Sequence, residues 1–391
     1  MKLLTKDNIL FFYFIYLIIG IYVYSVLQIK EFPAKYVFTE WLINYEGGYV
    51  RKGFLGQIIF YISNIFNIDL KLIILSFQIL IYSIYFSIFY LALSKIKFNF
   101  FWILIIFSPI LLLYPLTELE ALGRKDIFVI SFFLIFSMIN YKTLNRLITS
   151  FILLFGLSCL IHEITIFYIF HYLFVLHLKN KFFNNQKIAK KHYLIFFVFL
   201  GVLLYLNLFL HNFVIIENIV NSYNYDNFTS ESGSFSHISP SIDSVFLKTF
   251  NNISIVTVVR YGFVFLINTA PLFYFIKLKD EYANKYFKFN NIFFIILLLS
   301  IPLYLLIFDW GRIIYINHNF FIIIVILIFN MNLIDEKYFQ KKLDSLNQIL
   351  KIFVFIIICL SFSPKILITD DLASFPLYRS VTKIIKMIDP L

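Results

Sequence analysis

Long runs of apolar residues recur along the whole chain, and short polar segments separate them. A helix that crosses a bilayer needs about 20 predominantly apolar residues, and shorter helices can cross inside a bundle. The runs therefore predict an all-α, polytopic transmembrane helix bundle with about eleven spans. The predicted spans lie near 8–27, 70–93, 99–117, 127–140, 148–161, 164–178, 193–211, 256–276, 291–308, 317–334 and 352–364.

The polar segments predict one integral membrane domain rather than several domains. Lys2 and Lys6 precede the first apolar run, and no small-residue cleavage site follows it, so we expect an uncleaved first helix. The stretch 53–68 is apolar but short, and we expect it to lie along the membrane surface. The predicted organisation is a single domain over 1–391, with a first outer loop at 28–69, a large outer loop at 212–255 and a C-terminal tail at 365–391.

The composition fits a chain that is dissolved in lipid. Hydrophobic residues make up 61% of the chain and charged residues 14%, whereas soluble domains usually carry about 25% charged residues. The net charge of +11 comes largely from lysines in short loops, which is a topological bias and not a nucleic-acid-binding stripe. Cys159 and Cys359 lie far apart in apolar runs and predict neither a disulfide nor a metal site.

The lysines also predict which segments face the cytoplasm. Lys and Arg concentrate in cytoplasmic loops of membrane proteins, and the segment 179–192 holds five lysines and no acidic residue. We therefore expect a cytoplasmic N-terminus and an external C-terminal tail. The predicted inner segments are 1–7, 94–98, 141–147, 179–192, 277–290 and 335–351.

The arginines follow a different pattern from the lysines. Of six arginines, only Arg146 lies in a predicted inner segment, and Arg379 lies in the outer tail. The planar guanidinium group makes paired hydrogen bonds to phosphate or carboxylate groups. The pattern predicts a site for anionic substrate groups at the outer face. The four arginines at predicted outer boundaries are Arg51, Arg124, Arg260 and Arg312.

Two outer segments place carboxylates and cations close together. In the first outer loop, the paired glycines after Glu46 allow a tight turn that could bring Glu46 and Arg51 together, beside Lys52. The alternative is an interfacial loop with a surface ion pair. Between the third and fourth spans, Arg124 and Lys125 are adjacent cations that can neutralise a diphosphate. The alternative there is a charge cluster that fixes a helical hairpin.

Two further segments carry polar residues inside or beside apolar runs. His162 and Glu163 interrupt a long apolar stretch and need polar partners, since a lone charge in lipid is costly. We expect an outer arginine to partner Glu163; the alternative is a structural pair that holds a helical turn. Asp309 and Arg312 are spaced to pair on one helix face, which is the structural alternative to a substrate site. Arg260 is a weaker candidate.

The chain resembles the O-antigen polymerases of the Wzy type, and more broadly the polytopic membrane glycosyltransferases of the GT-C kind. The resemblance rests on size, topology, richness in Phe, Ile and Tyr, and the outer arginines. It implies a carboxylate in the first outer loop, for which Glu40 or Glu46 is the match. It also implies an interfacial helix, for which 53–68 is the match, and a lipid-linked sugar donor.

The resemblance implies an enzyme of the bacterial inner membrane that joins polyprenyl-diphosphate-linked oligosaccharide repeats at the periplasmic face. The alternatives are a glycosyltransferase that uses a polyprenyl-phosphate sugar donor and a non-enzymatic flippase. Membrane lipid and a chain-length regulator protein are further candidate partners, and no cofactor or metal is expected. Glu163, Glu46 and Asp309 compete for the role of general base, and His162 would orient or assist it. The candidate substrate-binding cations are Arg51, Lys52, Arg124, Lys125, Arg260 and Arg312.

Overall fold

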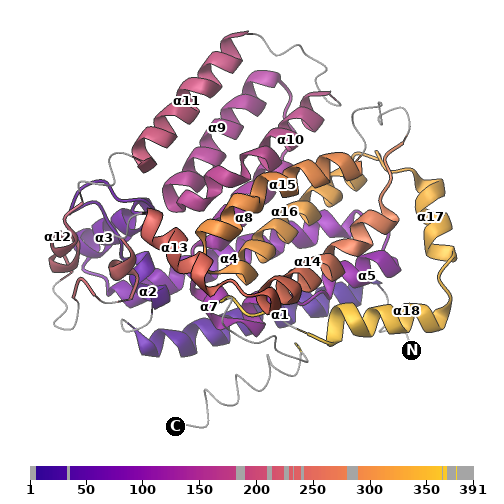
Figure 1. Cartoon of the computed structure of the whole chain (residues 1–391), viewed down its shortest axis with the longest axis horizontal. Coiled ribbons are helices and arrows are strands. Elements are labelled where there is room, and N and C mark those ends of the chain that lie inside the picture. Colours follow the sequence, from indigo (N-terminus) through magenta and orange to yellow (C-terminus); the bar gives the residue numbers. More distant parts are fainter. Residues whose placement is uncertain are drawn as a thin grey trace. The chain divides into compact units, whose positions relative to one another are not determined.

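The computed structural model describes residues 6–32, 36–181, 190–208, 214–223, 229–231, 233–238, 242–279, 289–362, 364–367 and 376. Within these ranges every regular element is helical, so the all-α prediction is confirmed (Figure 1). The helices of the first half are α1 (Lys6–Gln28), η1 (Ile29–Glu31), α2 (Tyr36–Trp41), α3 (Phe54–Phe66), α4 (Leu70–Ser94), α5 (Phe100–Ile106), α6 (Tyr114–Thr117), α7 (Leu119–Gly123), α8 (Asp126–Met138), α9 (Leu144–Ile161), η2 (Glu163–Tyr168) and α10 (Ile169–Lys179). Those of the second half are α11 (Lys190–Leu208), α12 (Ile216–Asn221), η5 (Gly233–His237), α13 (Ile242–Asn252), α14 (Ile255–Phe275), α15 (Phe289–Leu306), α16 (Trp310–Asn330), α17 (Glu336–Asp344), α18 (Gln348–Phe355) and η6 (Ile356–Leu360).

Several of these helices are long and apolar enough to cross a bilayer. Five pass this criterion, and they are Asn8–Gln28 within α1, Leu70–Ser94, Leu144–Ile161, Ile255–Phe275 and Trp310–Asn330. The bent pair of α17 with α18 and η6 makes six if it counts as one span. The chain is therefore a multi-pass helical membrane protein, as its apolar runs predict.

The predicted count of eleven crossings is not confirmed within the described residues. The predicted span 99–117 is interrupted, because α5 ends at Ile106 and α6 begins only at Tyr114. Pro109 lies in the gap, and proline lacks a backbone donor and disfavours helix in the residue before it. Four other apolar helical stretches are shorter than a full span, namely Phe54–Phe66, Asp126–Met138, Leu194–Leu206 and Phe293–Leu306.

The chain forms two compact units, and each has its own core. The first unit contains Met1–Tyr24, Phe86–Leu122 and Asp243–Leu391. Its central helix is α16, which is buried along nearly its whole length and contacts both α14 and α15 (Figure 1). Such enclosure suits its second half, because residues 320–329 are all apolar. The rings of Phe101, Phe275, Phe329 and Phe339 close one end of this core, with centroids 5.3–6.2 Å apart.

Segments of the first unit that were predicted on the same membrane side lie together. At one end, Lys277 pairs with Asp335 at 3.4 Å, and Leu278 forms an isolated antiparallel bridge with Ile334. Lys277, Leu278 and Asp335 lie in segments predicted as inner, and Ile334 is the last residue of the predicted span 317–334. In the segments predicted as outer, the backbone N–H of Gly311 donates to the carbonyl of Ile366 at 3.1 Å. Each contact joins segments that the predicted order of crossings places at the same side of the membrane.

The second unit contains Ser25–Tyr85 and Gly123–Ile242. Its core is built around α9, which contacts α8, η2, α10 and α11 (Figure 1). The Tyr172 ring is central there, with the rings of Phe133, Phe136 and Phe155 at 4.8–5.6 Å. The short helix α2 packs against η5. This unit holds most of the candidate site residues.

Candidate functional site

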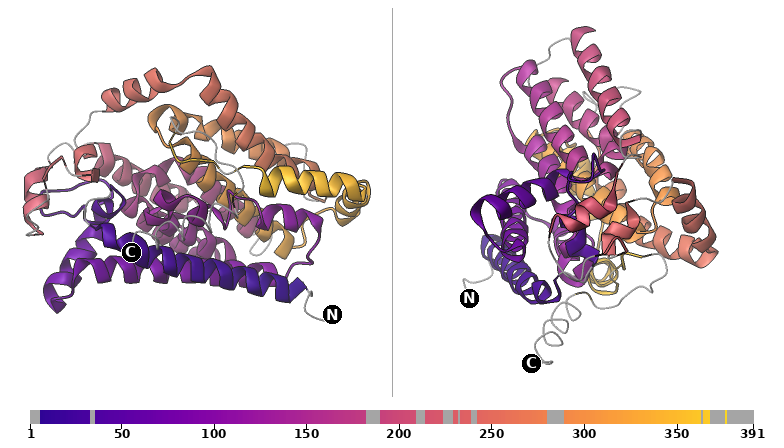
Figure 2. Two further views of the ribbon diagram at one scale, coloured as in Figure 1. Left: turned by 90° about the horizontal axis from the view of Figure 1, so that it is seen from below. Right: turned by 90° about the vertical axis from the view of Figure 1, so that its left-hand side faces the viewer.

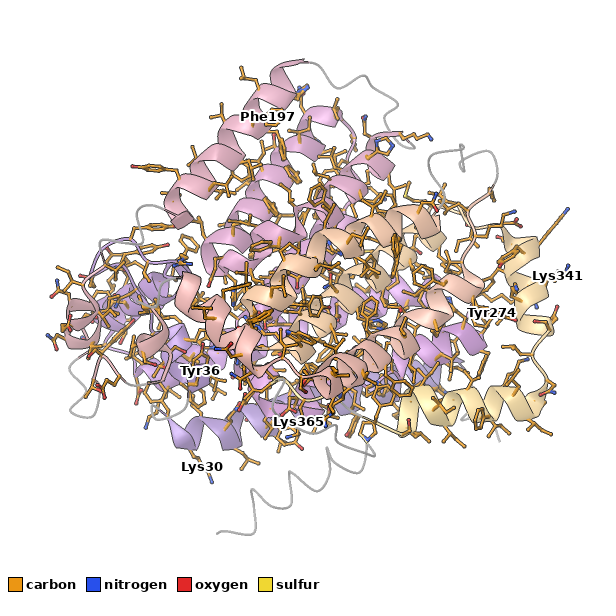
Figure 3. All side chains as sticks on the ribbon, viewed as in Figure 1. Lys30, Tyr36, Phe197, Tyr274, Lys341 and Lys365 are labelled. Atoms are coloured by element: carbon orange, nitrogen blue, oxygen red, sulfur yellow. The ribbon has the colours of Figure 1, made fainter. Side chains whose placement is uncertain are left out.

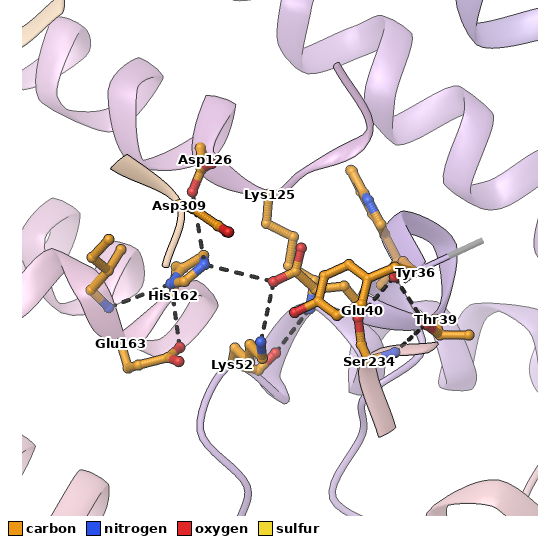
Figure 4. A network of polar contacts seen from close by, with 12 residues as sticks. Tyr36, Thr39, Glu40, Lys52, Lys125, Asp126, His162, Glu163, Ser234 and Asp309 are labelled. Carbon is orange, nitrogen blue, oxygen red and sulfur yellow. Dashed lines mark hydrogen bonds and ion pairs between the residues drawn. The ribbon is translucent and has the colours of Figure 1, made fainter. Parts of the chain in front are cut away.

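A group of charged side chains is buried in the second unit, and we call it the charged cluster (Figure 4). Its residues come from α2, the loop before α3, the start of α8 and the junction of α9 with η2. Removing a charge from water costs several kcal/mol, even after relaxation, unless another charge or dipole compensates it. The cluster provides that compensation by combining carboxylates with cations. Its members are Glu40, Lys52, Lys125, Asp126, His162 and Glu163.

The His162 imidazole lies between three carboxylates. Its Nε2 atom is 3.6 Å from Oε1 of Glu40 and 3.7 Å from Oδ1 of Asp126. Its Nδ1 atom is 3.3 Å from Oε2 of Glu163, and the backbone nitrogen of Ile164 lies 3.4 Å from the same atom. Both ring nitrogens therefore face carboxylate oxygens. This arrangement holds the ring in one orientation.

A break in the helix aims His162 into the cluster. The helix α9 ends at Ile161, and His162 adopts an extended backbone with φ −150° and ψ 116° before η2 begins. The backbone N–H of His162 still donates to Ser158 O at 2.8 Å, and Thr165 Oγ1 donates to the same carbonyl at 3.2 Å. The polar groups released by the break are therefore satisfied locally, as burial requires.

The two lysines of the cluster are linked through a strained turn. The Lys52 ammonium donates to Oε1 of Glu40 at 3.3 Å. The Lys52 backbone has φ +60°, a left-handed conformation that residues other than glycine rarely adopt. The fully buried ammonium of Lys125 donates to the carbonyl oxygen of Lys52 at 2.9 Å. Lys125 thereby stabilises the turn that delivers Lys52 to Glu40.

The surroundings of Lys125 shift its proton affinity. Burial lowers the pKa of Lys125 from 10.5 to about 7, and the nearby charge of Lys52 acts in the same direction. The carboxylates of Glu40 and Glu163 oppose that shift. The Lys125 ammonium consequently titrates near neutral pH, where an ordinary lysine would remain charged.

Glu163 is the most accessible carboxylate of the charged cluster. Its side chain is 31% exposed, whereas Glu40 is fully buried and Asp126 is 3% exposed. Burial raises the pKa of Glu163, but the charges of His162 and Lys52 and hydrogen bonds to the carboxylate outweigh it and hold the pKa well below its usual range. Glu163 is therefore ionised at neutral pH, and its side chain is partly exposed while its Oε2 atom beside His162 is buried.

The two predicted outer loops meet beside this cluster. The backbone N–H of Ile215 donates to Gly47 O at 2.8 Å, and the N–H of Ser234 donates to Thr39 Oγ1 at 2.7 Å. Both contacts join the loop 28–69 to the loop 212–255, which agrees with their predicted placement on one side of the membrane. They also brace α2, which carries Glu40.

Gly56 makes a close approach that shapes the same loop. A Cβ atom at this position would lie 1.9 Å from the Ile43 carbonyl oxygen, so α3 can pack on residues 41–43 only with glycine there. We expect Gly56→Ala to lower stability, because overpacking typically costs about 1–3 kcal/mol. The apparent melting temperature in detergent should fall by several degrees. Gly201→Ala in α11 is the matched control, since its Cβ would meet nothing within 4 Å; equal melting of the two variants would contradict the packing argument.

Three other predicted residues of this unit lie outside the charged cluster. The Arg124 guanidinium is buried over the Tyr36 ring at 5.1 Å, so the adjacent cations Arg124 and Lys125 do not act as one pair. Glu46 is exposed, and its Oε1 accepts a hydrogen bond from Gln57 Nε2 at 2.9 Å. Arg51 is half-buried. We expected an arginine to partner Glu163. In the structure, His162 and the charge of Lys52 take that role.

The remaining predicted residues lie in the first unit. Arg312 Nη1 is 3.4 Å from Oδ2 of Asp309, so the structural alternative of an ion pair is present. Both lie at the N-terminal end of α16, which begins earlier than the predicted span 317–334. Arg260 is a half-buried residue of α14. The structure adds a pair that we did not predict, between Lys365 and Glu118 at 3.9 Å.

The sequence pattern alone did not identify two members of the charged cluster as site residues. Glu40 entered only through the family resemblance, and Asp126, which directly follows Arg124 and Lys125, was given no role. The signal for Asp126 is its place at the start of an apolar run, directly after two cations. For Glu40 the pattern gives no such signal, because its partners lie up to 122 residues away.

Comparison with other proteins does not assign the site. No protein-family model, curated protein or solved structure matches the chain significantly. Within the described part of the chain, no group of three or more His, Cys, Asp or Glu side chains is placed to hold a metal ion. The charged cluster is therefore the feature of the chain that bears on its function.

Proposed function

We propose that the protein is a surface-polysaccharide polymerase of the bacterial inner membrane, which joins polyprenyl-diphosphate-linked oligosaccharide repeats at the periplasmic face. The observation that supports this most is the charged cluster, where an accessible ionised carboxylate, a held imidazole and a lysine lie together. Buried ionisable groups in membrane proteins commonly mark substrate sites. The lysine bias supports a cytoplasmic N-terminus and a periplasmic site.

The proposed reaction transfers one growing chain to a new repeat. The acceptor sugar hydroxyl attacks the anomeric carbon of the donor sugar, and its proton passes to Glu163. The bond between the anomeric carbon and the diphosphate oxygen breaks, and its electron pair leaves with the polyprenyl diphosphate. His162 positions Glu163 through its Nδ1 atom, while Glu40 and Asp126 hold the opposite edge of the ring. General base catalysis of this kind contributes about 10²–10⁴-fold.

Cations stabilise the departing diphosphate in this proposal. Lys52 is suited to that role because its side chain is 12% exposed at the edge of the cluster, and Arg51 precedes it directly. Lys125 and Arg124 are too deeply buried to meet the phosphates. They act instead on the protein, Lys125 through the Lys52 carbonyl and Arg124 through the Tyr36 ring.

Deletion of the gene in its own bacterium tests the proposal. We expect electrophoresis of the surface polysaccharide to show carrier molecules that bear a single repeat, since repeats are still made and exported. A chain-length regulator partner would alter the length distribution but not remove the first repeat. Carriers without any repeat would overturn the proposal and favour one of the two alternatives, a glycosyltransferase that adds a sugar from a polyprenyl-phosphate donor or a flippase.

A further inference from the structure

The first unit changes from a polar to an apolar surface at the turn between α17 and α18, which we call the elbow (residues 336–360). The two helices meet at 96° (Figure 2). The helix α17 buries Phe339 and Leu343 against the unit and exposes Lys337 and Lys341 on its outer side. Lys341 projects away from the ribbon in Figure 3.

Beyond the bend, α18 buries none of its own residues. Its outer face carries an exposed apolar row at helical spacing: Ile349 is 80% exposed, Ile352 59%, Phe353 58% and, in the first turn of η6, Ile356 47%. A row of this size is unfavourable in water and is typical of a lipid-facing helix. The exposed apolar residues of α14, such as Val259 and Leu266, show that other helices of the unit also present lipid-compatible surfaces.

A set of tyrosine and lysine contacts fixes the elbow at this boundary. The Lys342 Nζ atom is 4.4 Å from the centroid of the Tyr274 ring and 5.5 Å from that of Tyr338. Tyr274 also contacts Ser345 through their hydroxyl groups at 3.2 Å. Tyrosines with lysines nearby are typical of the headgroup level of a membrane, where a ring can be apolar on one side and wet on the other. The elbow therefore has a defined geometry at a membrane interface.

We propose that the elbow binds an anionic phospholipid. Lys337 and Lys341 contact its phosphate, and one acyl chain lies along the apolar row of α18. The exposed lysines of α17 and the exposed apolar row that follows on α18 favour a lipid over a water-soluble anion, which would contact only the lysines. This site is independent of the charged cluster and of the proposed polymerase reaction.

Lipid titration of the intact purified protein in detergent tests the proposal. Native mass spectrometry would count bound phosphatidylglycerol against bound phosphatidylcholine at matched concentrations. We expect preferential binding of phosphatidylglycerol that weakens with salt. Each basic residue near a charged membrane contributes about fivefold in affinity, so Lys337→Gln with Lys341→Gln should raise the half-saturating phosphatidylglycerol concentration on the order of 25-fold.

Lys95→Gln with Lys97→Gln is the matched control, because both side chains are exposed in another predicted inner loop of the same unit. This control should retain the wild-type preference. Equal binding of the two lipids, or an unchanged preference in the elbow variant, would overturn the proposal. A third result would also overturn the proposal. If the protein were a dimer, and Phe353→Ser made it a monomer without changing lipid binding, a second copy of the chain and not a lipid would cover the apolar row.

Discussion

Glu163→Gln is expected to abolish polymer formation while the protein stays at its normal level in the membrane. The substitution keeps the shape of the side chain and its hydrogen-bonding capacity but removes the proton acceptor. Loss of a general base typically costs about 10²–10⁴-fold in rate. Because the side chain is 31% exposed, water can compensate for the lost charge beside His162. Gel electrophoresis of the polysaccharide and an immunoblot of the membrane fraction would measure both effects.

Two other carboxylates make this experiment specific. Glu40 is fully buried and pairs with Lys52 and His162, so Glu40→Gln removes one partner of a buried ion pair, which typically costs about 3–5 kcal/mol. We expect that variant to accumulate poorly. Glu46 is exposed and accepts a hydrogen bond from Gln57 of α3, so Glu46→Gln should behave like wild type. Polysaccharide of normal length from the Glu163→Gln strain would exclude Glu163 as the base, and loss of polymer in Glu46→Gln would move the base to the first loop.

The sequence predicts the long helices and the helix break at His162 and Glu163, because both depend on residues that are close together in the chain. Uninterrupted apolar runs are enough to predict helices such as 255–275, since hydrophobic length determines a span. The pair His162 and Glu163 interrupts such a run, and the structure places the helix break at that point. The break in 99–117 was missed because the apolar pattern continues through Pro109 and hides it.

The partners of the site were not predictable in the same way. Glu40 lies beside His162 in a fold where Ser234 braces α2 and the break after α9 turns the ring toward Glu40. Neither contact leaves a periodic signal, since the residues are far apart in the chain. The left-handed turn at Lys52 is likewise invisible in the pattern, because lysine is not a residue that favours positive φ. Which charged residues pair depends on the tertiary structure. The sequence predicts only that a charged residue inside an apolar run needs a polar partner.

Polymerase activity is expected to fall as pH rises through about 7, because the Lys125 ammonium that holds the Lys52 turn then loses its proton. Burial lowers the pKa of Lys125 from 10.5 to about 7, so the charged form is complete only below that range. Membrane vesicles with lipid-linked repeats, assayed from pH 5.5 to 9, would give the profile. Lys125→Met should lower activity at pH 6 on the order of 10–100-fold, since a hydrogen bond to a charged group is worth about 1.5–3 kcal/mol, and should flatten the fall above pH 7.

The direction of the stability change separates this effect from unfolding. Because the pKa of Lys125 is lower in the folded state than the ordinary value of 10.5, the unfolded chain binds more protons between pH 7 and 10.5, and this group makes the fold more stable as pH rises. A loss of activity in that window therefore accompanies a gain, not a loss, in the contribution of Lys125 to stability. Lys30→Met is the matched control, since Lys30 is an exposed lysine of the same unit, and it should keep the wild-type pH profile. A profile that falls identically in Lys125→Met would show that another group titrates and that Lys125 does not position Lys52.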